Sequence, residues 1–317
     1  MGFTEKGDVE LKILVTGGAG FIGSHLSDTF IDAGHEVVIV DNLLMGRMEN
    51  VNPKAAFYLM DIRSETLQKV FEKEKIDVVC HQAAQMDVRK SVADPMFDAD
   101  VNVKGTLNIL QNCVRHQVKK VLFASTGGAI YGEQDVHPCD ETHPNRPVSP
   151  YGITKLCVEK YLFYYAKEFG LKHVILRYSN VYGPRQNPHG EAGVVAIFSK
   201  KLLSGDQPVI NGDGKQTRDY VYVGDVAQAN LKALTYSQNE IFNVGTGLET
   251  DVNAIFNHLN RLTGGKAQEN HGPAKGGEQM RSVISHAKAK EKMGWQPQMA
   301  LADGLKETVL FFRELLQ

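Results

Sequence analysis

The feature that most restricts the fold of this chain is an alternation of short β-branched runs with longer stretches of helical periodicity, extending from Leu11 to about Arg177. Short apolar runs of this kind are typical of buried strands, and the stretches between them are long enough for helices. Strands and helices in alternation form a parallel sheet with helices on both faces. We therefore expect an α/β fold on a doubly wound parallel sheet, with strands at residues 11–16, 35–41, 55–61, 75–81, 118–125 and 171–179.

The second half of the chain has a different pattern. Beyond Asn180, clusters of glycine and proline separate shorter helical segments, which is typical of a loop-rich region. We expect residues 1–180 to form the first unit and residues 181–317 a smaller C-terminal α/β lobe that binds substrate, with segments of the two interlocked. The final helix is predicted over about Leu301 to Leu315, where apolar residues recur at helical spacing.

Composition excludes several classes of function. The 35 basic and 37 acidic residues are spread along the chain without a basic block, so no nucleic-acid partner is expected. No uninterrupted apolar run has the length of a signal peptide or a membrane span. The cysteines have no paired metal-ligand spacing, so we expect no metal and reduced thiols in a cytoplasmic protein; they are Cys80, Cys113, Cys139 and Cys157.

A glycine-rich segment follows the first predicted strand. Residues 17–23, GGAGFIG, satisfy both GxxGxxG and GxGxxG, with a strand before them and a helical pattern after them. Glycines in this context allow a tight turn and close backbone approach to a pyrophosphate at a helix N-terminus. An ordinary glycine turn would not require Asp41 at the end of the second strand. A carboxylate there accepts bonds from ribose hydroxyls and repels an added phosphate, so the sequence predicts a Rossmann-type site for NAD.

The sequence YGITK carries the candidate chemistry. Tyr151 and Lys155 are four residues apart at the start of a predicted helix, so their side chains share one face. A phenol is a poor base at neutral pH, but a neighbouring ammonium and an oxidised nicotinamide both favour phenolate. Tyr151 would then remove a hydroxyl proton while Thr126 bonds the oxygen that becomes a carbonyl. This spacing also occurs on ordinary surface helices, and the dinucleotide motif upstream favours the catalytic interpretation.

Several further motifs, in chain order, resemble those of the extended short-chain dehydrogenases. They are TGGAGFIGSHL, Asp61 after a strand, STGGAIYG, YGITK, RYSNVYGPRQ, RDYVYVGDVA and NVGTG, and they span nearly the whole chain. Within that family the chain is most similar to the UDP-glucose 4-epimerases. The resemblance implies an NAD-dependent isomerase that interconverts UDP-glucose and UDP-galactose through a 4-keto intermediate, with Thr126, Tyr151 and Lys155 as catalytic residues.

The resemblance also implies which residues surround the cofactor. Pyrophosphate contacts fall on Gly17, Gly20, Phe21, Ile22 and Gly23. Ribose contacts fall on Asp41 and Asn42, and adenine contacts on Asp61 and Ile62. The rest of the cofactor would be surrounded by Gln82, Ala83, Ala84, Asn102, Ser125, Tyr151, Lys155 and Tyr178.

Substrate contacts follow from the same resemblance. Residue type alone would make Arg218 and Arg281 ordinary surface arginines, whereas the resemblance makes them ligands of the diphosphate of a UDP-sugar. The other implied substrate residues are Thr126, Asn180, Gly193, Val194, Val195, Val209, Asn211, Glu278 and Ser282. Ser282 corresponds to a steric gate, and its small size implies that the N-acetyl forms of both sugars are accepted as well.

Other functions stay open at this point. A UDP-glucuronate 4-epimerase, a nucleotide-sugar dehydratase or a decarboxylase would begin with the same oxidation at C4. The last two need acid-base groups next to the catalytic threonine, where this chain has Gly127, Gly128 and Ala129. A non-catalytic NAD-binding protein would not need the Tyr151 and Lys155 pair. The resemblance further implies a homodimer formed through helices near residues 98–115 and 151–169.

Overall fold

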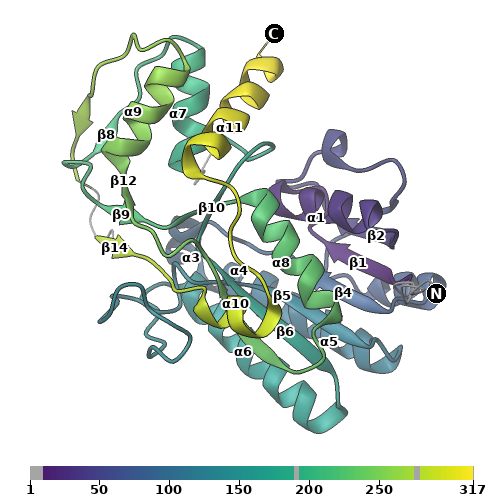
Figure 1. Cartoon of the computed structure of the whole chain (residues 1–317). Coiled ribbons are helices and arrows are strands. Elements are labelled where there is room, and N and C mark those ends of the chain that lie inside the picture. The colour runs from purple at the N-terminus through teal and green to yellow at the C-terminus, as the bar shows by residue number, and fades with distance from the viewer. Residues whose placement is uncertain (1–9, 189–192, 275–278, 317) are drawn as a thin grey trace, which may run out of the picture.

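A seven-stranded sheet forms the centre of the molecule (Figure 1). The structure is a computed structural model that describes residues 10–188, 193–274 and 279–316. All strand pairs of the sheet are parallel, and their spatial order is β11-β6-β5-β4-β1-β2-β3. The strands are β1 Lys12–Thr16, β2 Glu36–Asp41, β3 Ala56–Leu59, β4 Val78–His81, β5 Lys120–Thr126, β6 Lys172–Tyr178 and β11 Glu240–Val244. The predicted doubly wound sheet and its six predicted strands are confirmed.

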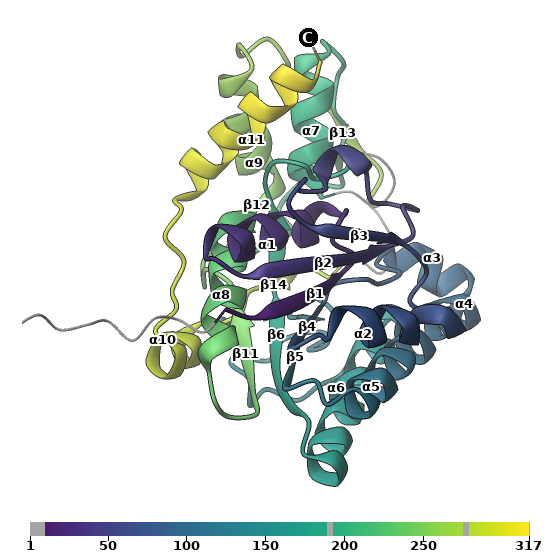
Figure 2. The ribbon, with the colours of Figure 1, turned by 90° about the vertical axis from the view of Figure 1, so that its right-hand side faces the viewer.

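Helices cover both faces of this sheet because alternate strand residues point to opposite sides. Ile13 and Val15 of β1 enter the apolar core on one side, with α1 Phe21–Asp32 and α8 Val223–Thr235, whereas Leu14 enters the core on the other. That second core is closed by α2 Gln68–Glu74, α5 Gly105–Arg115 and α6 Pro150–Phe169. Figure 2 shows the strands between these two helix layers.

Short elements complete the first part of the chain and join the layers. They are the 3-10 turns η1 Met48–Asn50 and η2 Glu65–Leu67, the helices α3 Val88–Ala93 and α4 Pro95–Ala99, and the π-helical turn η3 Asp100–Lys104. The segment α3–α4–η3 packs along α6. Because it follows β4 directly, it lies at the carboxyl ends of the strands, where open parallel sheets bind their ligands.

A third apolar core stands apart from the sheet, at the top of Figure 1. It lies among α7 Val194–Leu203, α9 Val252–Leu262 and α11 Leu301–Leu315, which confirms the predicted final helix. The same half of the chain forms three small sheets. Two are strand pairs, β7 Asn180–Tyr182 with β10 Tyr220–Tyr222 and β8 Ile210–Asn211 with β13 His271–Gly272. The third has β9 Thr217–Arg218 between β12 Thr250–Asp251 and β14 Arg281–Ser282.

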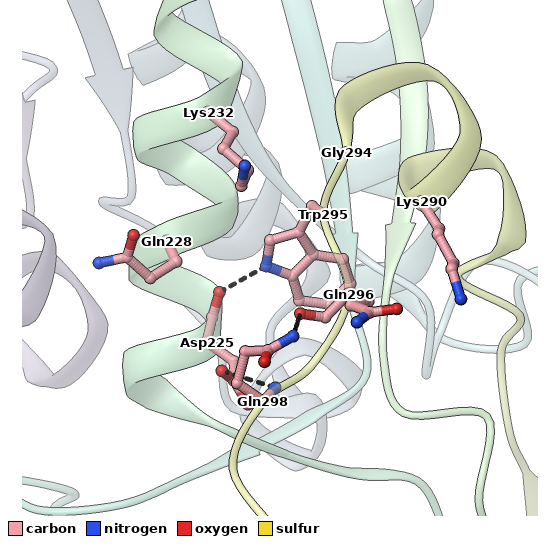
Figure 3. Close-up of a pocket in the computed structure, with 8 residues that line it drawn as sticks. All are labelled: Asp225, Gln228, Lys232, Lys290, Gly294, Trp295, Gln296 and Gln298. Atoms are coloured by element: carbon pink, nitrogen blue, oxygen red, sulfur yellow. Dashed lines mark hydrogen bonds between the residues drawn. The ribbon is translucent and has the colours of Figure 1, made fainter.

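The second half of the chain also returns to the sheet. Strand β11 pairs with β6, and α8 packs on α1. Trp295, which follows α10 Ala287–Met293, is buried, and its indole N–H donates to the carbonyl of Asp225 on α8 at 2.9 Å. Figure 3 shows this anchor and the shallow surface pocket around it. The division into two interlocked units near residue 180 stays a prediction.

Lys120, at the start of β5, joins the sheet to the end of α8. Its ammonium donates to the carbonyls of Ala233, Leu234 and Tyr236 at 3.2, 2.6 and 2.7 Å, so it satisfies groups that a helix C-terminus leaves without partners. Within the described ranges, no helix combines the length and the apolar character needed to cross a membrane.

Replacing this lysine should weaken the fold measurably. We expect Lys120→Met to lower the free energy of unfolding by about 1–3 kcal/mol, because buried carbonyls lose their donor. The neighbouring Lys119→Met removes only an exposed ion pair with Asp77 and should change it by less than about 0.5 kcal/mol. Urea denaturation of both variants checks this, and equal effects would refute the role given to Lys120.

Candidate active site

The glycine turn between β1 and α1 has the geometry that its sequence predicts. Gly17 has a φ of +70°, a left-handed backbone conformation that residues with a side chain rarely adopt. Its N–H donates to the carbonyl of Val40 at 2.8 Å. A Cβ at Gly17 would lie 2.8 Å from the backbone nitrogen of Ala83. Helix α1 begins at Phe21, so its first amides have no partner within the helix. The turn can therefore hold an anionic group close to the backbone.

The end of β2 lies beside this turn. The Asp41 carboxylate is buried and accepts hydrogen bonds from the N–H groups of Ala19 at 3.0 Å and Leu43 at 2.8 Å. Each of its oxygens keeps a second lone pair, so Asp41 can still accept from a ribose hydroxyl. The amide of Asn42 donates to Asp61 at 3.0 Å, which brings two of the predicted cofactor residues together.

Asp61, just beyond β3, is held by Arg63. The guanidinium donates to both carboxylate oxygens at 2.9 Å, and these bonds keep the pKa of Asp61 well below its usual range. Ile62 is buried, and a Cβ at Gly105 would lie 2.7 Å from its side chain. Asp61 is therefore a fixed carboxylate that accepts hydrogen bonds at the edge of the glycine-turn region.

The residues after β4 meet those after β6. Gln82 donates to the hydroxyl of Tyr178 at 3.3 Å, and Asn230 of α8 donates to the same hydroxyl at 2.8 Å. Ala83 approaches Thr16 of β1, its N–H lying 3.3 Å from the hydroxyl oxygen. Ala84 follows in the same half-buried segment. These contacts bring the carboxyl ends of β1, β4 and β6 together.

His81, the last residue of β4, lies beneath this edge and is structural. Its ring nitrogens contact the hydroxyls of Thr16 at 2.7 Å and Thr106 at 2.9 Å. Burial, together with the charge of Lys155, lowers the pKa of His81 to about 3. His81 is therefore a neutral bridge between β1 and α5.

The catalytic candidates Tyr151 and Lys155 lie on the first turns of α6. Ser149 caps this helix, its side-chain oxygen accepting from the N–H of Gly152 at 3.2 Å. The Lys155 ammonium donates to the carbonyl of Ala124 at 2.9 Å and lies 5.8 Å from the centre of the Tyr151 ring. The predicted shared face of the two side chains is present, and it is turned towards the end of β5.

Burial corrects part of the electrostatic expectation for this pair. It raises the pKa of Tyr151, with a further contribution from the carboxylate of Asp98, and it lowers the pKa of Lys155 to about 8. The neighbouring ammonium alone therefore does not make Tyr151 a phenolate, because desolvation of this half-buried phenol favours its neutral form. A second positive charge, such as that of an oxidised nicotinamide, is required.

A buried ion pair supports the end of β5. Arg177 of β6 donates to both oxygens of Glu159 on α6, at 2.9 and 2.6 Å, and both side chains are almost fully buried. The Ser125 hydroxyl also donates to Glu159, at 2.6 Å, so this predicted cofactor residue is committed to a protein partner. Sequence reasoning missed the pair, although a Glu one turn after Lys155 was its available signal.

Thr126 and Asn180 face a common space beside Gly128. A Cβ at Gly128 would lie 3.9 Å from the hydroxyl of Thr126 and 3.8 Å from the amide oxygen of Asn180. Thr126 is half-buried and Asn180 is exposed. The predicted catalytic hydroxyl of Thr126 and the predicted substrate residue Asn180 therefore both lie next to Gly128, which has no side chain to separate them.

The two predicted diphosphate arginines lie on adjacent small strands but point to opposite sides. Ser282 pairs with Arg218, and Arg281 pairs with Thr217, and paired residues of neighbouring strands share a face. Arg281 is exposed and forms a bidentate ion pair with Glu249, in which its Nε and Nη2 donate to the two carboxylate oxygens at 2.9 and 2.6 Å. Their common role at a diphosphate stays a prediction.

The remaining predicted substrate residues surround the third core. Gly193 precedes α7, Val194 and Val195 begin that helix, Val209 is exposed before β8, and Asn211 ends β8. Ser282 is buried, and its carbonyl accepts from the N–H of Asp219 at 2.9 Å. Glu278 lies outside the described residues. Their contacts with a substrate stay predictions.

Asn102, a predicted cofactor residue in η3, is the centre of a buried polar cluster. Its amide oxygen accepts from the N–H of Gln85 at 2.8 Å, and its amide nitrogen lies within 3.2 Å of the Gln85 carbonyl, Asp98 and Thr154. Sequence reasoning missed these three partners because they come from separate elements. Among the described residues, no group of three or more His, Cys, Asp or Glu side chains could hold a metal ion.

Comparison with known proteins gives consistent relatives. The model of the NAD dependent epimerase/dehydratase family matches residues 13–245. A UDP-glucose 4-epimerase of Thermotoga maritima, solved with UDP-glucose, is 48% identical with a TM-score of 0.95, and the match covers 97% of this chain and 100% of that one. A Thermus thermophilus UDP-glucose 4-epimerase, solved with NAD, is 44% identical with a TM-score of 0.91, covering 96% and 99%.

A third relative acts on an N-acetyl sugar. The UDP-N-acetylglucosamine 4-epimerase of Methanobrevibacter ruminantium, solved with UDP-N-acetylmuramic acid, is 34% identical with a TM-score of 0.92. The match covers 96% of this chain and 99% of that one.

The glycine turn, the remaining acceptor capacity of Asp41 and the position of Lys155 fit NAD as the cofactor of this chain as well.

The glycine turn can be tested with a matched pair of variants. Gly17 and Gly34 both have positive φ, at +70° and +86°, but a Cβ at Gly34 meets nothing within 4 Å. Backbone strain should cost each alanine variant about 1–2 kcal/mol of unfolding free energy, and Gly17→Ala should lose more because its Cβ would meet the backbone of Ala83. Only Gly17→Ala should also bind NAD about tenfold or more weakly, as measured by calorimetric titration. Unchanged NAD affinity in Gly17→Ala would contradict the proposed approach of the cofactor to this turn.

Proposed function

The chain belongs to the NAD dependent epimerase/dehydratase family, and we propose that it is a UDP-hexose 4-epimerase that interconverts UDP-glucose and UDP-galactose. The observation that carries this proposal is the position of Tyr151 and Lys155 on one face of α6, with the Lys155 ammonium 5.8 Å from the centre of the Tyr151 ring. This face lies at the end of β5, which bears Thr126. Bound NAD supplies a reversible acceptor for the hydride at C4 of the sugar.

The chain's own residues manage the proton. Tyr151 takes the proton of the C4 hydroxyl, and the Thr126 hydroxyl donates to the oxygen as it becomes a carbonyl. The 4-keto sugar then turns within the site, and Tyr151 returns the proton when the hydride is added to the other face. The reaction therefore consumes no external oxidant.

Binding energy should reside in the UDP portion. The hexose must be free to turn, so interactions that held it in one orientation would slow the reaction. Arginine is suited to a diphosphate because its guanidinium stays charged and matches phosphate oxygens. We propose that Arg218 holds this group, with Arg281 as a second candidate whose ion pair with Glu249 would have to open.

Elimination or decarboxylation is less consistent with the residues around Thr126. Gly127 is buried, and Gly128 presents only backbone to the space between Thr126 and Asn180. No carboxylate therefore follows the threonine to assist a second chemical step. Simple return of the hydride needs no such group, which favours epimerisation over a dehydratase, a decarboxylase or a non-catalytic role.

Product analysis tests the substrate range. Incubation with UDP-glucose, UDP-galactose, their N-acetyl forms and UDP-glucuronate should give the 4-epimers of the first four without added cofactor, provided that NAD is retained through purification. Acceptance of the N-acetyl sugars follows from the small Ser282 at the proposed gate. Turnover of the non-acetylated pair alone would refute the gate.

Tyr151→Phe should lower turnover by a factor of at least about a hundred, because it removes the acid-base group.

We also propose that the protein is a cytoplasmic homodimer. Four cysteines without a disulfide support a reducing compartment. Large apolar side chains are exposed on α4 and α6, which pack on each other: Met96 is 80% exposed, Ile153 54% and Phe163 69%. Exposed apolar side chains on two helices that pack together favour a second copy of the chain as their partner.

Light scattering tests the dimer. The wild-type protein should have a mass of about 70 kDa, twice the 35.1 kDa of the chain. Phe163→Glu should shift the equilibrium to monomer because it places a charge in the contact. Leu315→Glu, at a position 56% exposed on α11, is the control and should leave the mass unchanged. A dimer that survives Phe163→Glu would exclude α6 as the contact.

A further inference from the structure

Asp98 is a fully buried carboxylate at the end of α4 that the proposed reaction does not yet use. It accepts hydrogen bonds from the amides of Gln85 at 2.9 Å and Asn102 at 3.1 Å, and from the hydroxyl of Thr154 at 2.7 Å. All three donors are neutral, so these bonds stabilise the carboxylate but leave its negative charge in place. Burying such a charge is costly, and a buried charge acts strongly on neighbouring titratable groups because little water screens it.

The neighbours that matter are the catalytic pair. Thr154, which binds Asp98, lies between Tyr151 and Lys155 on α6, and its hydroxyl oxygen is 3.0 Å from the Tyr151 carbonyl. The charge of Asp98 adds to burial in raising the pKa of Tyr151, and it opposes the burial that lowers the pKa of Lys155. A single carboxylate thus favours a neutral phenol and a charged ammonium at once.

Other charged groups lie on the elements packed against α6, including α3, whose Ser91 accepts from the N–H of Tyr151 at 3.2 Å. Glu159 is paired with Arg177 of β6, and His81 of β4 is neutral. Asp100 of η3 is bound by Arg63 and Lys104. On α3, the Lys90 ammonium lies 4.5 Å from the centre of the Phe97 ring, and Arg89 is exposed. Arg115 lies at the far end of α5, and Lys120 and Lys172 lie at the far ends of β5 and β6.

We propose that Asp98 is a positioning residue that holds Tyr151 in its protonated form until the positive charge of an oxidised nicotinamide is present. The inference rests on the proposed role of Tyr151 as the acid-base group. It explains how one phenol serves both directions of a reversible reaction. With the oxidised cofactor bound, Tyr151 can release its proton to solvent and then take the proton of the C4 hydroxyl, and after oxidation of the sugar the charge of Asp98 holds that proton ready for return.

Asp98→Asn tests this with little change of shape. The new amide oxygen can accept from Gln85 and Asn102, and the new amide nitrogen can donate to Thr154, whose proton then turns to the Tyr151 carbonyl. Removing the charge should move the acid limb of the pH profile of kcat/KM to lower pH by about one unit, because the phenol ionises more easily. An unmoved acid limb would overturn the proposal.

A matched control separates charge from general damage. Asp225 on α8 is another buried carboxylate bound by neutral donors, the N–H groups of Gln298 and Met299, but α8 covers the face of the sheet opposite α6. Asp225→Asn should lower the unfolding temperature without moving the acid limb. Asp98→Ser, which also removes the charge, should repeat the shift of Asp98→Asn, and serves if the asparagine variant folds poorly.

A direct titration distinguishes failure of this inference from failure of the proposed function. The ultraviolet absorbance of phenolate is followed against pH in the NAD-saturated protein, with the corresponding Tyr151→Phe protein as the blank. The Tyr151 signal should have a midpoint about one unit lower in Asp98→Asn than in wild type. Equal midpoints would refute the coupling whatever the activity. A shifted midpoint together with full turnover by Tyr151→Phe would leave the coupling intact and refute the role of Tyr151.

Discussion

The ion pair between Glu159 and Arg177 is the interaction on which the geometry of the active site depends. It lies between α6 and β6 with both side chains almost fully buried, and Glu159 also accepts the hydroxyl of Ser125 at the end of β5. Arg177 donates in turn to the hydroxyl of Tyr131, which donates to Asn243 of β11. Loss of either partner would leave an uncompensated buried charge. The catalytic helix is therefore fixed to three adjacent strands directly below Lys155.

The same burial that makes this pair strong also sets the chemistry above it. Desolvation of half-buried Tyr151 and buried Lys155 favours the neutral form of each, so proton transfer depends on the charges that remain nearby. Asp98 and the Lys155 ammonium act on the phenol in opposite directions. This balance suits a reaction in which one group must first accept a proton and later give it back.

The buried carboxylate of Asp219 brings distant motifs together. Asp219, which follows Arg218, accepts from the N–H and hydroxyl of Thr246, from the N–H of Gly247 and from the N–H of Ile284. The segments RDYVYV and NVGTG and the residues just after β14 are far apart in the sequence but converge on this side chain. Asp219 therefore fixes the small sheet that carries Arg218 and Ser282 against the end of β11.

The local structure of this protein follows from short stretches of its sequence. Six strands, the glycine turn at Gly17 and the helix that carries Tyr151 follow from periodicity and turn chemistry, which act over a few residues. Only the tertiary structure placed β11 beside β6, Asp98 near Tyr151 and Glu249 against Arg281, because these partners are distant in sequence and carry no periodic signal. It also decided the proton affinity of Tyr151, since burial outweighs the neighbouring lysine and depends on the whole fold.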